Sequence, residues 1–161
     1  MKRTASAVWT GNLKEGHGSL SSESGVLTAT PYGFNARFDS GPGTNPEELI
    51  GAAHAGCFSM ALAAQLGDAG LIPERITTFA AVTLEKLDDG FAITQVHLTV
   101  TASIPGMTQR SFEAFAEKAK RGCPVSKLLT ATITMDAKLD EPVPDAAAPK
   151  VAPRLPKVAA G

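Results

Sequence analysis

The sequence predicts an α+β protein in which one long central helix is wrapped by antiparallel strands. Three observations support this class: residues 49–67 carry no charge, alternating apolar segments flank the turn Asp88-Asp89-Gly90, and an apolar stripe at helical spacing follows over residues 109–121. A chain of 161 residues can bury one proper core, so one folded domain is expected.

The long helix is expected to run from Asn45 to Gly70. Asn45 can cap the free amides of the first turn, Pro46 suits the first helical position, and Glu48 completes a capping-box pattern. Gly70 supplies a left-handed stop. An uncharged run of this length would suit a membrane span. Its many alanines and glycines instead favour a helix that protein buries on all sides.

Short strands are expected before the long helix. Thr4–Trp9 and Gly18–Glu23 are predicted to form a hairpin, and Val26–Ala29 is predicted to be a further short strand. Residues 31–33 are expected to turn the chain. Phe34–Phe38 alternates in the manner of a strand, which would place its apolar side chains on one face and Arg37 on the other.

The segment after the long helix is expected to form a strand, a second strand, a helix, a short helix and a last strand. In that order, the predicted bounds are Ile76–Lys86, Phe91–Ser103, Gln109–Arg121, Pro124–Leu129 and Thr132–Leu139. Thr108 is the expected cap of the first of these helices, and Gly122 is its expected stop. Residues 141–161 are rich in proline and alanine without periodicity, so we expect a domain over residues 1–140 and a flexible tail.

Composition excludes several classes of function. The formal net charge is -1, the hydrophobic share is 43% and the charged share is 19%, as in soluble globular proteins. Charge alone therefore predicts binding neither to nucleic acid nor to an anionic membrane. The first residues lack the apolar stretch of a signal peptide, which predicts a cytoplasmic protein. In a reducing cytoplasm, its two cysteines are expected to be buried, metal-binding or redox-active.

Cys57 lies in the middle of the long helix, too far from its N-terminus for the helix dipole to activate the thiol. Its neighbours one turn away are mostly small or apolar, which suits an apolar substrate but keeps a thiol protonated unless a cation approaches. Arg37 is the best candidate for that cation. The alternative is that Cys57 is a small core residue, because unpaired cysteine is among the most buried residue types.

Glu47 raises a problem of distance. Ten positions separate it from Cys57, which is about 15 Å along the axis of one helix. If both belong to one site, either Glu47 contacts Arg37 while Arg37 contacts Cys57, or the site combines residues from two chains. A monomer of this size would also struggle to cover the uncharged helix, which predicts a homodimer.

Cys123 is placed differently, between the helix stop Gly122 and Pro124 at the start of a short helix. Backbone amides and nearby positive side chains favour a thiolate there. His54 lies one turn from Cys57 and could be a hydrogen-bonded structural residue, the base for a nucleophile or a metal ligand. The other histidines and Cys123 lack the spacing of a metal site, so no metal is predicted.

Several segments closely resemble the OsmC branch of the OsmC/Ohr family of thiol peroxidases. The resemblance extends over roughly residues 4–139 and is most specific around the first cysteine. The matching segments are Asn45–Leu62 (NPEELIGAAHAGCFSMAL), Gly122–Ser126 (GCPVS), Ser22–Leu27 (SESGVL), Pro31–Asn35 (PYGFN) and Gly90–Thr94 (GFAIT).

The resemblance implies an OsmC-like fold in an intertwined homodimer with active sites at the subunit interface. It implies that Cys57 is the peroxidatic cysteine and Cys123 the resolving one, with Arg37 and Glu47 as the pair that holds the thiolate ready. It also implies an organic hydroperoxide substrate and no cofactor. The implied reductant is an external dithiol, with a lipoyl-type dithiol, such as a lipoylated protein, as the candidate.

On this basis the expected function is reduction of organic hydroperoxides through a sulfenic acid and then a disulfide, in oxidative or osmotic stress defence. Two alternatives remain open. One is a thiol–disulfide reductase centred on Cys123, with Cys57 structural. The other is a non-catalytic module that binds an apolar ligand beside an inert Cys57.

Overall fold

The structure is a computed structural model, and it describes residues 1–140. It confirms the predicted α+β class. In chain order, the elements of the described part are β1 (Ala5–Thr10), β2 (His17–Ser22), β3 (Thr30–Gly33), α1 (Phe34–Phe38), α2 (Pro46–Asp68), β4 (Arg75–Leu87), β5 (Gly90–Ser103), α3 (Gln109–Gly122), α4 (Pro124–Leu128) and β6 (Thr132–Leu139). The predicted tail over residues 141–161 lies outside the described residues.

The first sheet has the order β1-β2-β3, and both pairs are antiparallel. The predicted hairpin is confirmed as β1 and β2. Gly18 lies directly against the ring of Tyr32, where a Cβ atom would collide with ring carbons. The Tyr32 ring in turn contacts Trp9, with ring centroids 5.4 Å apart. All six residues of β1 are exposed, so this sheet lacks a cover over its first strand.

The expected strand at Val26–Ala29 is wrong, because serine side chains hold this segment as a compact loop. The Ser22 hydroxyl accepts a hydrogen bond from the Leu27 amide at 3.1 Å, and the Ser21 hydroxyl accepts one from the Ala29 amide at 3.0 Å. Ala29 has a positive φ of 49°, which a strand cannot accommodate.

The expected turn at residues 31–33 and the expected strand at Phe34–Phe38 are also wrong. Residues 30–33 form β3, where Pro31 is tolerated because the strand lies at a sheet edge. Phe34–Phe38 is the short helix α1. Phe34 and Phe38 stack with ring centroids 4.9 Å apart, since residues four apart also share a helix face. A five-residue apolar alternation therefore fits both periodicities.

The expected ends of the long helix are confirmed in α2. The Asn45 side chain accepts a hydrogen bond from the Glu48 amide at 2.8 Å, and Gly70 has the left-handed φ of 73° just beyond the helix. The Glu48 carboxylate accepts a hydrogen bond from the Thr44 hydroxyl at 3.2 Å. Local capping residues thus define where α2 begins and ends.

Burial of α2 on all sides is not observed within one chain. The residues of α2 that are buried lie along one face: Gly51, His54, Phe58, Leu62 and Leu66. Met60, away from that face, is 76% exposed. By length and composition α2 could cross a membrane, and 28% of its most apolar window is buried. The remaining apolar surface of this helix is left without a cover.

The second sheet has the order β4-β5-β6. The predicted antiparallel hairpin of β4 and β5 is confirmed, but β6 runs parallel to β5, so the prediction of a wholly antiparallel sheet is wrong. The crossover through α3 and α4 returns the chain to the starting end of β5, which makes a parallel neighbour possible.

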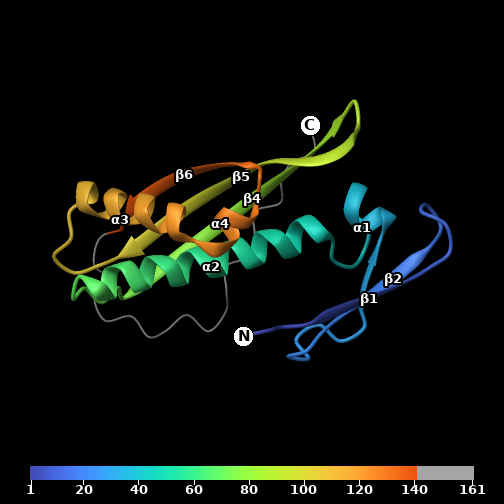
Figure 1. Ribbon diagram of the computed structural model, residues 1–161, viewed down its shortest axis with the longest axis horizontal. Helices are drawn as coiled ribbons and strands as arrows, with labels where there is room; N and C mark the ends of the chain where they lie inside the picture. Colours follow the sequence, from blue (N-terminus) through green and yellow to red (C-terminus); the bar gives the residue numbers. More distant parts are fainter. Residues whose placement is uncertain (141–161) are drawn as a thin grey trace.

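The core lies between this sheet and the helices α2 and α3, which pack side by side on it (Figure 1). The Thr108 hydroxyl caps α3 by accepting from the Ser111 amide, as predicted. The first sheet lies beyond the N-terminal end of α2, away from the core (Figure 1). Asp140 ends the described chain beside β5, where its amide bonds to the Ala102 carbonyl.

Candidate active site

Two cysteines that are 66 positions apart in the chain meet in the structure. The Sγ atoms of Cys57 and Cys123 are 3.2 Å apart, and both thiols are free. Cys57 projects from the middle of α2, and Cys123 lies at the junction of α3 and α4. The Cys123 amide closes α3 by donating to the Ala119 carbonyl, and its carbonyl accepts from the Lys127 amide in α4. The packing of α2 against α3 and α4 therefore brings the sulfurs together.

The two thiols differ in exposure and in acidity. Cys57 is half-buried, whereas Cys123 is fully buried. Burial raises the pKa of Cys57, and the neighbouring Cys123 adds to the rise, against one hydrogen bond from the Val125 amide. Burial also acts to raise the pKa of Cys123. The Ser126 amide, the Cys57 thiol, the Ser126 hydroxyl and the Val125 amide all favour the thiolate and outweigh burial, so the pKa of Cys123 is lowered.

His54 is the one fully buried histidine near the thiol pair. Its Nε2 lies 2.8 Å from the Ser126 hydroxyl, whereas Nδ1 is buried and has no hydrogen-bond partner within residues 1–140. Burial lowers the pKa of His54, which keeps the ring neutral at neutral pH. No group of three potential metal-ligating side chains is found in the described part of the chain.

Arg37 and Glu47 form an ion pair at the N-terminal end of α2. Arg37 Nη2 lies 2.7 Å from Glu47 Oε1, and Arg37 Nε lies 3.2 and 3.1 Å from the two carboxylate oxygens. The guanidinium also lies over the Phe38 ring, 5.2 Å from its centroid, and Phe38 contacts Phe91. The pair lines a hollow of about 400 Å³ whose lining is about equally polar and apolar. The other lining residues are Pro46, Ile50, Leu84, Phe91, Ala92, Ile93, Leu129, Thr130 and Ala131.

This ion pair and the thiol pair occupy different parts of α2. Glu47 precedes Cys57 by ten positions in one unbroken helix, which corresponds to about 15 Å along its axis. The structure therefore brings Cys57 to Cys123 and Arg37 to Glu47, as two separate pairs within one chain.

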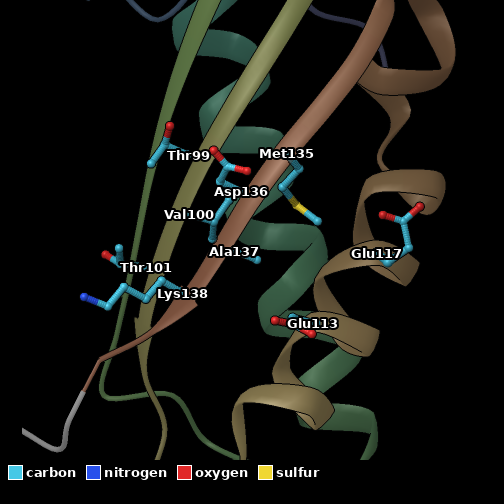
Figure 2. A pocket seen from close by; sticks show the side chains of 9 residues that line it. All are labelled: Thr99, Val100, Thr101, Glu113, Glu117, Met135, Asp136, Ala137 and Lys138. Carbon is cyan, nitrogen blue, oxygen red and sulfur yellow. The ribbon is translucent and has the colours of Figure 1, made fainter.

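A second hollow, of about 600 Å³, lies between α3 and the strands β5 and β6. Figure 2 shows Glu113 and Glu117 on α3, with Met135, Asp136 and Lys138 on the neighbouring strand. Its lining contains neither a thiol nor an imidazole. This hollow therefore offers no sulfur or imidazole nucleophile, in contrast to the surroundings of Cys57 and Cys123.

Comparison with known proteins identifies the family. The model of the family described as OsmC-like protein matches residues 38–138, which include Glu47 and both cysteines. The chain belongs to the OsmC-like protein family. Peroxiredoxin OsmC of Escherichia coli (strain K12) is 55% identical over 133 residues, covering 83% of this chain and 93% of that protein. An organic hydroperoxide resistance protein of Xanthomonas axonopodis pv. citri is 31% identical over 100 residues, covering 62% and 68%.

Solved structures of similar proteins agree with this fold. The organic hydroperoxide resistance protein OhrB of Bacillus subtilis has a TM-score of 0.61 at 25% identity, covering 85% of this chain and 98% of that one. The organic hydroperoxide resistance protein of Elizabethkingia anophelis, with thiocyanate bound, has a TM-score of 0.62 at 26% identity, covering 88% and 98%. An OsmC-like protein of unknown function from Vibrio cholerae has a TM-score of 0.69 at 16% identity, which shows the fold.

Sequence reasoning did not single out Ser126 as a site residue. It lies within the short segment Gly122–Ser126 that resembles the family, which is the one signal that could have drawn attention to it. Its contact with His54 joins residues 72 positions apart, and no local pattern predicts such a contact.

Proposed function

We propose that this OsmC-like protein is a thiol-dependent peroxidase of stress defence that reduces organic hydroperoxides to alcohols. The main observation in favour of a mechanism that uses both cysteines is the 3.2 Å separation of the Cys57 and Cys123 sulfurs. A disulfide can form at this site with little movement of α2 or α4, because the sulfurs are already in contact.

The difference in exposure supports Cys57 as the cysteine that reacts with peroxide and Cys123 as the one that resolves it. A peroxide can reach Cys57, which is half-buried, more readily than Cys123, which has no exposed surface. Cys123 contacts Cys57 and is therefore suited to react with it. The same burial argues against a reductase centred on Cys123, since an external disulfide would have to reach that sulfur directly.

The proposed cycle has three steps: oxidation of Cys57, formation of the disulfide and its reduction. The Cys57 thiolate attacks the terminal peroxide oxygen; an S–O bond forms, the O–O bond breaks, and the alkoxide leaves and takes a proton to become the alcohol. The Cys123 thiolate then attacks the Cys57 sulfenic acid. An S–S bond forms and hydroxide leaves, taking a proton from solvent to give water. An external dithiol reduces the disulfide and becomes oxidised itself, and a lipoyl-type dithiol is our candidate.

The raised pKa of Cys57 means that the first step needs a cation that its own surroundings do not supply. We assign this role to Arg37 of a second copy of the chain, oriented by Glu47. The ion pair of the same chain lies too far along α2 to serve. Dimerisation would also cover the exposed strand β1 and the exposed side of α2, including Met60.

The substrate class is inferred from the hollow beside Arg37 and from the names of relatives. The hollow combines the polar Arg37–Glu47 pair with aliphatic side chains and the Phe91 ring, so it offers the hydrocarbon part of an organic hydroperoxide a contact that hydrogen peroxide cannot make. Relatives carry the name organic hydroperoxide resistance protein, in agreement with this class. A cytoplasmic location remains a prediction from the sequence.

The test is to add one equivalent of cumene hydroperoxide to the reduced protein and follow both thiols by mass spectrometry. We expect an intramolecular Cys57–Cys123 disulfide, formed faster than with hydrogen peroxide. Cys57→Ser should abolish the reaction, whereas Cys123→Ser should stop at a sulfenic acid that a dimedone-type reagent traps. Two thiols that stay free would contradict the peroxidase and leave ligand binding by the hollow beside Arg37.

A further inference from the structure

The thiol pair continues into a chain of polar side chains, His54 and Ser126, that the proposed cycle does not use. His54 lies one turn before Cys57 on α2, and Ser126 lies three residues after Cys123 on α4. The imidazole Nε2 and the serine oxygen are 2.8 Å apart. His54 and Cys123 have no exposed surface, and Ser126 between them is half-buried.

The proton positions along this chain follow from counting hydrogen-bond donors. If Nδ1 of His54 carried the proton, a ring N–H would be buried without an acceptor among residues 1–140. If Nε2 carries it, Nε2–H donates to the Ser126 oxygen, and the serine hydroxyl is free to donate elsewhere. The second arrangement uses both donors, and the neutral state of buried His54 permits it.

The free serine hydroxyl has one evident acceptor. The Ser126 side chain and amide both lie near the Cys123 sulfur and favour its thiolate. In the reduced state, the side-chain hydrogen bonds of the described residues join the Ser126 hydroxyl to His54 and the Cys123 thiol to Cys57, and the thiol does not cap α4. A thiolate is a much better acceptor than a thiol, so the hydroxyl should donate to the sulfur once Cys123 ionises.

We infer that His54 and Ser126 are positioning residues for the resolving step, and that Nε2–H of His54 orients the Ser126 hydroxyl toward the Cys123 sulfur. The inference rests on the proposed two-cysteine function. In that cycle the hydroxyl stabilises the Cys123 thiolate before it attacks the Cys57 sulfenic acid. The S–S bond then forms, and hydroxide leaves with a solvent proton, while neither His54 nor Ser126 changes its own protonation.

The cationic side chains nearby must be kept constant in any test. Lys120, Arg121 and Lys127 line a small hollow beside Ser126, and Glu117 forms ion pairs with the first two. Substitutions at His54 and Ser126 leave all four charges in place, so a changed acidity of Cys123 reports on the polar chain.

The first measurement is a pH titration of the cysteine ¹³Cβ chemical shifts in the reduced protein. Ser126→Ala should displace the Cys123 titration to higher pH, Ser126→Thr should restore it, and His54→Phe should displace it less than Ser126→Ala. His54→Gln, whose amide can donate from a similar place, should restore it. Ser59→Ala is the matched control, because Ser59 is a half-buried serine of α2 that bonds to Ala55 and Thr78. An unmoved Cys123 titration in Ser126→Ala would overturn the inference.

The second measurement separates the two steps after one equivalent of cumene hydroperoxide. In Ser126→Ala, sulfenic acid should form at the rate of the unchanged protein, and the disulfide should form about tenfold more slowly at neutral pH, since one charge-assisted hydrogen bond is lost. Equal disulfide rates would refute the positioning role. If the unchanged protein forms no disulfide, the proposed function fails, and the titration still decides whether the polar chain controls Cys123.

Discussion

Replacement of Glu47 by glutamine tests how much the Arg37–Glu47 pair contributes to the first chemical step. The carboxylate accepts from Nη2 and Nε of Arg37 at 2.7 to 3.2 Å. Two unit charges about 4 Å apart interact by about 4 kcal/mol at an effective dielectric constant of about 20. The Arg37 side chain is 35% exposed and that of Glu47 12%. Solvent screening therefore reduces the interaction free energy of the ion pair to about 1–2 kcal/mol.

A loss of this size lowers the rate of Cys57 oxidation by cumene hydroperoxide about tenfold, because each 1.36 kcal/mol corresponds to about a factor of ten. The assay is stopped-flow measurement of thiol consumption under single-turnover conditions. Glu48→Gln is the matched control: it removes the same charge from the same helical turn, but Glu48 bonds to Thr44 instead of Arg37. Equal rates in Glu47→Gln and Glu48→Gln would refute the reasoning that Glu47 orients Arg37.

Four further outcomes are expected. In Arg37→Ala, the rate of Cys57 oxidation should rise at a higher pH than in the unchanged protein, because burial raises the pKa of the thiol and no cation then lowers it. Coincident pH–rate profiles of the two proteins would contradict this. Burial lowers the pKa of His54, so the free energy of unfolding should fall as pH drops below the unfolded value of about 6.5, and denaturant titrations should show a weaker fall in His54→Gln. Met60→Glu should shift light scattering from dimer to monomer at micromolar concentration; a monomer in the unchanged protein would refute the dimer itself. Asn45→Ala should cost about 1 kcal/mol in thermal unfolding through loss of the α2 cap, and an unchanged Tm would count against that estimate.

Local chemistry predicted most elements of the fold. The cap at Asn45, the stop at Gly70, the cap at Thr108 and the turn before Gly90 each depend on residues within a few positions, and the structure contains all of them. Periodicity failed where the segment was short, as at Phe34–Phe38, because five residues do not separate a strand from a helix.

For the candidate site, the sequence indicated which residues take part but not how they are arranged in space. Cys57, Cys123, Arg37 and Glu47 were singled out from the sequence by their residue types and positions, and the resemblance to the family implied the role of each. Their assignment as catalytic residues remains a prediction that the experiments above test. Their arrangement in space was not predictable from periodicity or capping, since the residues of the thiol pair lie 66 positions apart.

The sequence by itself determined the chain's family, its α+β class, and a long helix with a thiol in the middle. These properties follow from short-range capping, hydrophobic patterning and recognisable segments. Only the tertiary structure decided that the two sulfurs touch, that Ser126 contacts His54, and that Arg37 pairs with Glu47 away from Cys57. The physical reason is that these contacts depend on how α2, α3 and α4 pack together and where α1 meets α2, and packing joins residues that no local interaction connects.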